Sequence, residues 1–273
     1  MQPFTLINGS ATRTLASSDR GFNFGQGVST RIKVVDGKPQ LWTEHMEILQ
    51  QGCRALGFGI NAVEKLVKRD LGLIPKADLS LRVTLTAGLG CATLVTPTEF
   101  VPTRILQVEP STYPQPSTDG VEVRLCQMRL GIQPRLAGIK QLNRMEQLLA
   151  RAEWRDSSVF DGIMLDTEGM LVGGTCSNLF WVSQGVLYTP SLEYAGIRGA
   201  MRTAILGLAQ RLGVPYQEVR QGPEALYGAQ EVFLCSSAIG ILPVKALQQT
   251  QYAVGGDGLT AQLQAALAQV LYA

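Results

Sequence analysis

Periodic apolar residues divide the chain into short strands and a few helices. Apolar residues recur every three or four positions across 44–56, through Met46, Leu49 and Cys53, which predicts an amphipathic helix. The same kind of pattern predicts further helices at 62–70, 143–153, 200–212 and 260–271. Short apolar runs bounded by turn residues predict strands at 4–7, 28–35, 79–85, 104–108, 121–126, 161–166, 178–182, 185–188 and 231–235.

One stretch lacks both patterns and separates two halves of the chain. Residues 109–120 contain three prolines together with Ser, Thr and Gly, a composition typical of an interdomain linker. We therefore expect an N-terminal α/β domain at 1–110, a linker at 111–120 and a C-terminal β-rich domain at 121–273. The mixed order of strands and helices, with many hairpin turns, predicts the α/β (α+β) class.

Composition excludes several kinds of partner. The 273 residues are 45% hydrophobic, which is enough for one large core or two small ones, and the formal net charge is +2. Without a run of Lys or Arg, nothing favours nucleic acid or an acidic membrane as partner. The longest apolar runs fall short of the roughly 18 residues of a membrane-spanning helix. Residues 1–8 lack the pattern of a signal peptide, so we expect a cytoplasmic location.

Cysteine and histidine usage narrows the chemistry. The five cysteines are odd in number, widely spaced and free of any CxxC pair, so neither a disulfide framework nor a metal site is expected. His45 is the one histidine, so a mechanism that requires two is excluded. We expect His45 to be a structural residue of the 44–56 helix. Asp19 and Arg20 are expected to form an ion pair.

Five segments, in order along nearly the whole chain, resemble the class IV pyridoxal-phosphate enzymes and among them the 4-amino-4-deoxychorismate lyases. They are SDRGFNFGQG at 18–27, LAGIKQLNRMEQ at 136–147, EGMLVGGTCSNLF at 168–180, AGIRGAMR at 195–202 and SSAIGILPV at 236–244. The resemblance implies fold type IV, with a two-layer α/β N-terminal domain and a C-terminal domain that is β-barrel-like with helices.

The resemblance also implies an activity. The lyases are homodimers that hold pyridoxal phosphate between two domains, act on a small-molecule substrate, aminodeoxychorismate, and release pyruvate to leave 4-aminobenzoate, a folate precursor. Other members of the class transfer amino groups of branched-chain or D-amino acids. Lys140, in the C-terminal domain, occupies the position of the cofactor-binding lysine. A lysine with that role must be partly unprotonated, and the apolar residues 136–139 before it are consistent with burial.

The remaining candidate residues concern the cofactor phosphate. A phosphate is favoured at a helix N-terminus, where backbone N–H groups are free. The candidates are Asn178, Arg198, Gly199, Ala200, Met201, Ser236 and Ser237. Four of the candidate residues have a plainer interpretation: Lys140 as a surface lysine before a helix, Ser236 and Ser237 as turn residues, and Arg198 as a solvated loop cation.

Three positions depart from the family pattern. The family's phosphate-binding arginine, three residues after the histidine, is Ile48, and its glutamate facing the pyridine nitrogen is Gly173. Glu168 precedes the turn glycine Gly169 and is not expected to reach that nitrogen. The substrate loop, TAGLGCAT at 86–93, has none of the family's arginines, so it offers substrate carboxylates no fixed positive charge.

Three functions therefore remain compatible with the sequence. The chain is a pyridoxal-phosphate lyase that forms 4-aminobenzoate, a class IV aminotransferase, or a relative that has lost the cofactor and has a binding or different catalytic role. Arg198 is a candidate to replace the missing arginine in the first two cases. The Gly173 substitution counts most against the aminotransferase, which needs a strong electron sink.

Overall fold

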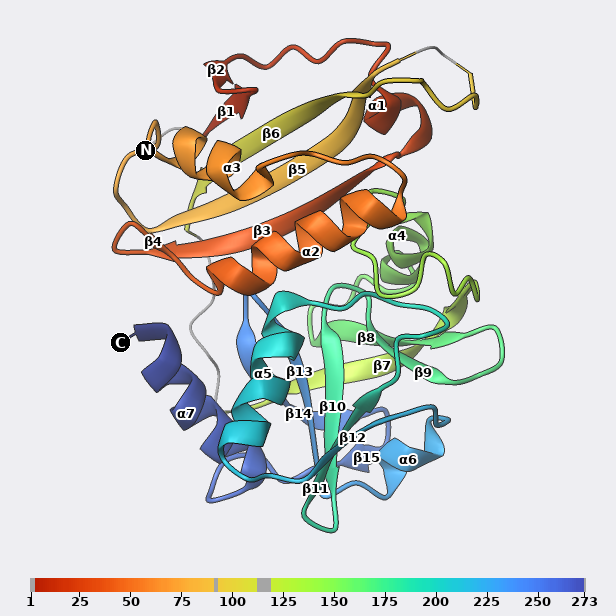
Figure 1. Cartoon of the computed structure of the whole chain (residues 1–273). Coiled ribbons are helices and arrows are strands. Elements are labelled where there is room, and N and C mark those ends of the chain that lie inside the picture. The colour runs from red at the N-terminus through yellow and green to blue at the C-terminus, as the bar shows by residue number, and fades with distance from the viewer. Residues whose placement is uncertain (1–2, 91–92, 112–118, 273) are drawn as a thin grey trace. The chain divides into compact units, whose positions relative to one another are not determined.

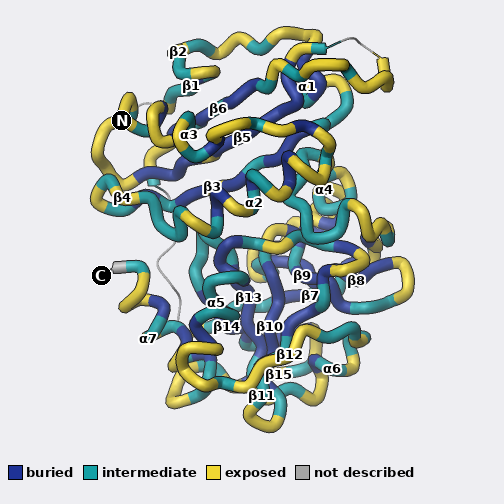
Figure 2. The backbone as a smooth tube through the Cα atoms, viewed as in Figure 1, coloured by how far each residue is buried: buried dark blue, intermediate teal, exposed yellow. Residues whose placement is uncertain are grey.

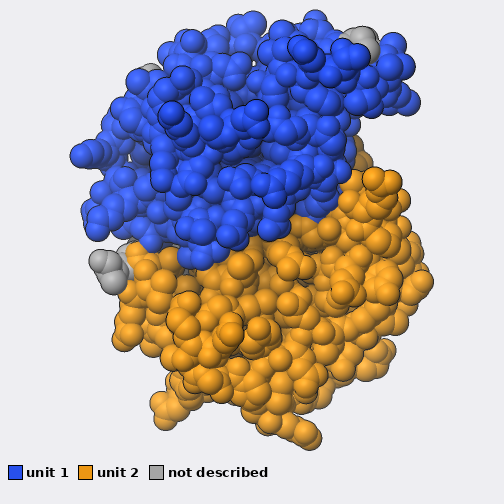
Figure 3. Space-filling view, in the orientation of Figure 1, with its two compact units in different colours: residues 1–113, 139–143 blue, residues 114–138, 144–273 orange. Residues whose placement is uncertain are grey.

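The computed structural model describes residues 3–90, 93–111 and 119–272, and its contacts divide the chain into two compact units. Unit 1 comprises residues 1–113 and 139–143, and unit 2 comprises residues 114–138 and 144–273 (Figure 3). Of the predicted linker, residues 112–118 lie outside the described residues. The short segment 139–143 belongs by its contacts to unit 1, although it lies beyond the linker in sequence.

Unit 1 is an antiparallel sheet with helices against it (Figure 1). The sheet has the strand order β2-β1-β6-β5-β3-β4. Its strands are β1 (Phe4–Ile7), β2 (Ser10–Ala11), β3 (Gly27–Val35), β4 (Lys38–Pro39), β5 (Leu79–Leu89) and β6 (Val101–Pro110). Its helices are α1 (Arg20–Phe24), α2 (Trp42–Ala55) and α3 (Val63–Leu71).

The core of unit 1 follows from the two periods of strand and helix. Alternate residues of β3, including Val28 and Ile32, are fully buried, and α2 contributes Met46, Leu49 and Cys53 to the same cluster. The buried central strands contrast with the exposed outer loops in Figure 2. Helix α2 therefore has its apolar stripe on β3, as the periodicity across 44–56 predicts.

Unit 2 is a mixed sheet. The strand order is β12-β11-β10-β13-β14-β7-β8-β9, and β15 pairs with β14. The pairs β11–β12, β14–β7 and β7–β8 are parallel. The strands are β7 (Val121–Leu130), β8 (Val159–Asp166), β9 (Leu171–Gly174), β10 (Asn178–Ser183), β11 (Val186–Pro190), β12 (Tyr216–Val219), β13 (Glu231–Ser236), β14 (Gly240–Leu247) and β15 (Thr250–Gln251).

Four helices complete unit 2: α4 (Met145–Arg151), α5 (Ala200–Arg211), α6 (Glu224–Tyr227) and α7 (Leu259–Tyr272). Helices α5 and α7 contact each other and strand β13. Leu179, Val232 and Leu234 are fully or almost fully buried in the sheet core. The antiparallel sheet of unit 1 and the mixed, half-barrel sheet of unit 2 confirm the predicted fold class.

Candidate active site

The N-terminus of α5 is the centre of the candidate site in unit 2. Gly199 is the N-cap residue, in an extended conformation, and α5 starts at Ala200. The N–H of Gly199 donates to Oδ1 of Asn178 (3.2 Å), and Nδ2 of Asn178 donates to the carbonyl oxygen of Ile197 (2.8 Å). A Cβ at position 199 would stand 2.4 Å from Oδ1 of Asn178, so only glycine fits beneath this amide.

The first turn of α5 offers free backbone donors to an anion. The first N–H groups of an α-helix have no partner within the helix, and the helix dipole gives that end a partial positive charge. Within the described part of the chain no side-chain cap is formed at the N-terminus of α5, and its first turn contains no acidic residue. The N–H groups of Ala200 and Met201, directly after the N-cap Gly199, form a cradle of the kind that fits a phosphate, and the assignment of these three residues to the cofactor stays a prediction.

Ser236 and Asn178 lie at the same end of two neighbouring antiparallel strands, β13 and β10. Strand β13 ends at Ser236, and its neighbour Cys235 is the cross-strand partner of Asn178 on β10. The Ser236 hydroxyl accepts a hydrogen bond from the N–H of Ala238 (3.3 Å), and Ser237 follows in the β13–β14 turn. Both serines are partly exposed residues.

Lys140 lies in unit 1 and not in the C-terminal unit where the sequence placed it. Its carbonyl oxygen accepts from the N–H of Ser29 (3.1 Å), and the N–H of Leu142 donates to the carbonyl oxygen of Gly27 (3.0 Å). Ile139 packs against the apolar core of unit 1. The segment 139–143 is thus held beside β3 by backbone hydrogen bonds and by an apolar side chain. The Lys140 residue itself is partly buried.

His45 lies close enough to Lys140 for their charges to interact. The imidazole is 1% exposed, its Nδ1 is 2.6 Å from Oγ1 of Thr30, and its Nε2 has no hydrogen-bond partner among the described residues. Burial, and after it the Lys140 charge, lowers the pKa of His45 to about 3. His45 is therefore neutral at pH 7 and adds no second cation beside the lysine.

The structure gives each substituted family position a definite environment. Ile48 is a partly buried residue of α2, and an alkyl side chain cannot pair with a phosphate. Gly173 is buried in β9, and a Cβ there would stand 3.1 Å from the carbonyl oxygen of Ser177. Glu168 is in the β8–β9 turn, where its carboxylate accepts from Arg220 (2.6 Å), as expected of an ordinary hairpin residue.

The side chain of Arg20 binds the C-terminal end of the 86–93 loop. Nη1 of Arg20 donates to the carbonyl oxygens of Thr93 (2.9 Å) and Val95 (3.4 Å), so a guanidinium from α1 holds this loop. Of the loop itself, residues 91–92 lie outside the described residues. The fully buried Asp19 carboxylate accepts from the hydroxyls of Thr103 (2.7 Å) and Thr86 (3.0 Å), and the Asp19–Arg20 ion pair stays a prediction.

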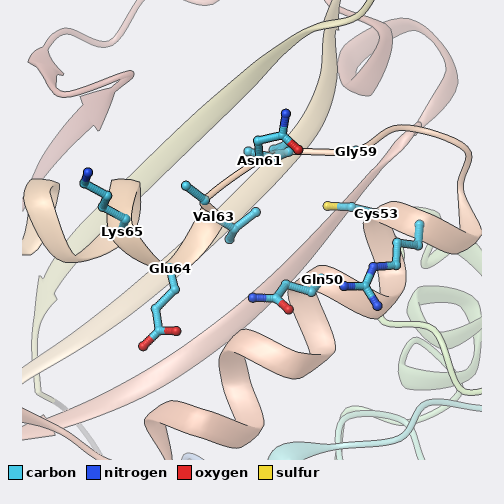
Figure 4. Close-up of a pocket in the computed structure, with 10 residues that line it drawn as sticks. Gln50, Cys53, Gly59, Asn61, Val63, Glu64 and Lys65 are labelled. Carbon is cyan, nitrogen blue, oxygen red and sulfur yellow. The ribbon is translucent and has the colours of Figure 1, made fainter.

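A separate pocket of about 470 Å³ lies in unit 1, where α2 ends and α3 begins (Figure 4). Cys53, Glu64 and Lys65 are among its lining residues. Burial raises the pKa of the Cys53 thiol to about 12, so it stays protonated at neutral pH. None of the residues predicted to hold the cofactor lines this pocket.

Two further classes of site are absent from the described residues. No group of three or more His, Cys, Asp and Glu side chains there has a geometry that could hold a metal ion. Within the same residues, no helix has the length and apolar character needed to cross a membrane.

The antiparallel sheet of unit 1 and the mixed half-barrel sheet of unit 2 are those of fold type IV of the pyridoxal-phosphate enzymes. The family model described as amino-transferase class IV matches residues 27–247. The chain belongs to the class IV aminotransferase family.

Individual relatives share the fold over almost the whole chain. The crystal structure of 4-amino-4-deoxychorismate lyase from Pseudomonas aeruginosa is 37% identical, has a TM-score of 0.91 and covers 97% of this chain and 98% of its own. The aminodeoxychorismate lyase of Vibrio harveyi is 29% identical over 88% of this chain and 90% of its own. A hypothetical aminotransferase from Mycobacterium tuberculosis, solved in a PLP-bound form, is 16% identical, with a TM-score of 0.80 and 98% of each chain covered.

Proposed function

We propose that the chain is a pyridoxal-phosphate-dependent lyase that acts on aminodeoxychorismate, releases pyruvate and forms 4-aminobenzoate for folate synthesis. Similarity to aminodeoxychorismate lyases over nearly the whole chain supports this activity. The structural observation that carries the proposal is that Gly138, two residues before Lys140, is hydrogen-bonded to the loop that leads into α5.

The connection between Gly138 and this loop consists of two hydrogen bonds. Its N–H donates to the carbonyl oxygen of Gly196 (3.0 Å), and its own carbonyl oxygen accepts from the N–H of Arg198 (3.0 Å). Gly138 is thus bonded to the loop that leads into α5. Lys140 follows two residues later, and two residues of chain span at most about 7 Å. Lys140 therefore follows closely, along the chain, a residue that is hydrogen-bonded to the loop before α5, which supports its assignment as the cofactor lysine.

The residues divide the work of binding the cofactor. The N–H groups of Ala200 and Met201 bind the phosphate, with the hydroxyls of Ser236 and Ser237 as further donors. Asn178 orients the loop from beneath. When bound, pyridoxal phosphate supplies an electron-withdrawing ring and an aldehyde.

Lys140 is the reactive residue of the proposal. Its amine would hold the cofactor through the aldehyde group and would accept the ring proton that the reaction removes. The neutral His45 beside it places no competing positive charge near that amine. An unprotonated lysine is required for both steps.

Arg198 is the proposed substitute for the missing phosphate-binding arginine. Its backbone lies in the loop that enters α5, and its side chain is exposed. Arg198→Ala is expected to weaken cofactor affinity about tenfold, the size of one lost charge-assisted contact. Arg211→Ala, at the other end of α5, is the matched control. Equal affinities of the two variants would leave Arg198 a solvated loop cation.

The test of the proposed activity uses purified protein and aminodeoxychorismate. Wild type with pyridoxal phosphate is expected to be yellow and to release equal amounts of pyruvate and 4-aminobenzoate. Lys140→Ala is expected to lose both the colour and the products. The control is Lys245→Ala, which changes a lysine of β14 that is paired with Glu122 of β7 and is expected to keep both. Product formation that persists in Lys140→Ala would contradict the proposal.

Two observations favour a second candidate, a relative that has lost the cofactor. Ile48 and Gly173 stand where the resemblance implies a phosphate-binding arginine and an acid facing the pyridine nitrogen. A protein that stays colourless in excess pyridoxal phosphate would support this second function. An aminotransferase is the third candidate. With an amino acid in place of aminodeoxychorismate, it would form the corresponding keto acid.

The family resemblance also implies a homodimer, which we retain as part of the proposal. Three apolar side chains of α4, those of Met145, Leu148 and Leu149, are more than half exposed, and exposed apolar groups of this kind mark interaction surfaces. Light scattering of the protein as it elutes from a size-exclusion column tests this point. One chain has a mass of 29.5 kDa, and we expect twice that mass. The mass of a single chain would contradict the dimer.

A further inference from the structure

Asp161 is a fully buried carboxylate whose partners all come from its own neighbour and one turn. It lies in β8. Its Oδ1 accepts from the N–H of Gly162 (2.8 Å) and from the N–H and the hydroxyl of Thr175 (3.1 and 2.5 Å). Its Oδ2 accepts from the hydroxyl of Ser177 (2.7 Å) and the thiol of Cys176 (3.5 Å). A buried carboxylate is stable only with such a set of donors.

The turn at 173–178 is built closely around this carboxylate. A Cβ at Gly174 would stand 2.4 Å from Oδ2 of Asp161 and 2.1 Å from Oγ of Ser177. The N–H of Gly174 also donates to the carbonyl oxygen of Ser177 (2.9 Å). From outside, Nη2 of Arg144 donates to the carbonyl oxygen of Thr175 (3.0 Å). The turn is thus fixed at several points, with Asp161 at its centre.

The same turn ends at the residue that holds the phosphate cradle. Asn178 follows Ser177 directly, and its amide binds the carbonyl oxygen of Ile197 (2.8 Å) and the N–H of Gly199 (3.2 Å). A shift of the turn would move this amide. A displaced amide would make weaker hydrogen bonds to the loop in front of α5.

We propose that Asp161 is a positioning residue of the cofactor-phosphate site, which holds the Thr175–Ser177 turn so that the Asn178 amide fixes the loop at the start of α5. The inference rests on the proposed function for its consequence, cofactor affinity. Its structural part, control of the 197–201 loop, is independent of the cofactor. Asp161 has no free acceptor position among the described contacts, so it acts through Asn178 and does not touch the ligand.

The first experiment follows backbone hydrogen exchange in the full chain without added cofactor. Asp161→Asn is expected to speed exchange in the peptide covering 197–201 about tenfold, the effect of weakening one hydrogen bond. Ser177→Ala removes a single donor to the same carboxylate and is expected to act in the same direction, which keeps the test available if Asp161→Asn fails to fold.

Asp166→Asn is the matched control. Asp166 lies on the same strand, is 1% exposed and also holds a turn, through the N–H groups of Glu168 (2.9 Å) and Met170 (3.0 Å). This variant is expected to lose stability while exchange at 197–201 stays within about twofold of wild type. Unchanged exchange at 197–201 in both Asp161→Asn and Ser177→Ala would overturn the proposal.

The second experiment measures the consequence with two ligands. Asp161→Asn is expected to weaken the binding of pyridoxal phosphate about tenfold, but not that of pyridoxal, which has no phosphate. Because Asp161 acts through Asn178, the double variant with Asn178→Ala should bind no more weakly than Asn178→Ala alone. Additive losses, or equal losses for both ligands, would overturn the positioning role.

The two experiments separate this inference from the proposed function. A wild-type protein that binds no pyridoxal phosphate contradicts the proposed function, and hydrogen exchange then decides the role of Asp161 by itself. A wild-type protein that binds the cofactor, with Asp161→Asn showing neither faster exchange nor weaker binding, contradicts only the role of Asp161.

Discussion

The surroundings of His45 keep its imidazole neutral at neutral pH, next to the lysine of the candidate site. His45 is buried on α2, bonded through Nδ1 to Thr30 and near the charge of Lys140. The sequence places it on the helix but gives no sign of the lysine, which is 95 positions later. This neutrality lowers the free energy of unfolding in acid, because His45 takes up a proton at a higher pH in the unfolded chain than in the folded one.

We predict that wild type loses stability between pH 7 and pH 5 through this residue. The pKa of His45 falls from 6.5 to about 3 on folding, so below pH 6.5 the unfolded state binds more protons and is favoured. The loss is about 2 kcal/mol at pH 5. Urea unfolding at both pH values should show this loss in wild type and a much smaller one in His45→Gln. Parallel pH dependences in the two proteins would show that His45 does not cause it.

Ile48 is the residue where a substitution should add function. If the site holds a phosphate as proposed, Ile48→Arg introduces the charge that the resemblance implies at this position. A charge-assisted contact contributes about 1.5–3 kcal/mol, so pyridoxal phosphate should bind about ten- to a hundredfold more tightly. Titration by absorbance measures this, with Ile48→Gln as the uncharged control. Equal affinity of Ile48→Arg and wild type would mean that position 48 does not face the phosphate.

At the scale of the element, the bounds of α5 agree closely with the helix predicted from the sequence. The pattern predicts a helix at 200–212, and the structure has Ala200–Arg211. Likewise α2 runs over Trp42–Ala55 where 44–56 was predicted. Both helices have a strong apolar period. The strands β2, β4, β9, β12, β14 and β15 were not predicted. Five of them have only two to four residues, which seldom show a pattern, and Pro243 interrupts the apolar run of the eight-residue β14.

Two glycines of α5 should respond in opposite ways to alanine. Gly199→Ala places a Cβ 2.4 Å from Oδ1 of Asn178, so we expect lower stability and about tenfold weaker pyridoxal phosphate binding. Gly207→Ala meets its nearest atom, Nη1 of Arg211, at an ordinary 3.7 Å and should stabilise the helix by about 0.5–1 kcal/mol. Thermal unfolding and cofactor titration check both, and tight binding in Gly199→Ala would contradict the cradle assignment.

At the scale of the whole molecule, sequence patterns account for the fold class but not for long-range partners. The antiparallel and mixed sheets follow from strand order and turns. The placement of 139–143 in unit 1 does not, because it depends on hydrogen bonds to Gly27 and Ser29, more than 100 positions away. Asp161 was missed because its donors at Thr175 and Ser177 come 14 and 16 residues later, beyond the reach of any local pattern.

The covalent bond between Lys140 and pyridoxal phosphate is the central claim, and borohydride reduction followed by peptide mapping tests it most directly. Reduction of the protein with bound cofactor should fix a phosphopyridoxyl group on the peptide that contains Lys140, and Lys140→Ala should retain none. A cofactor fixed on another lysine, or no fixed cofactor at a saturating concentration, would contradict the account.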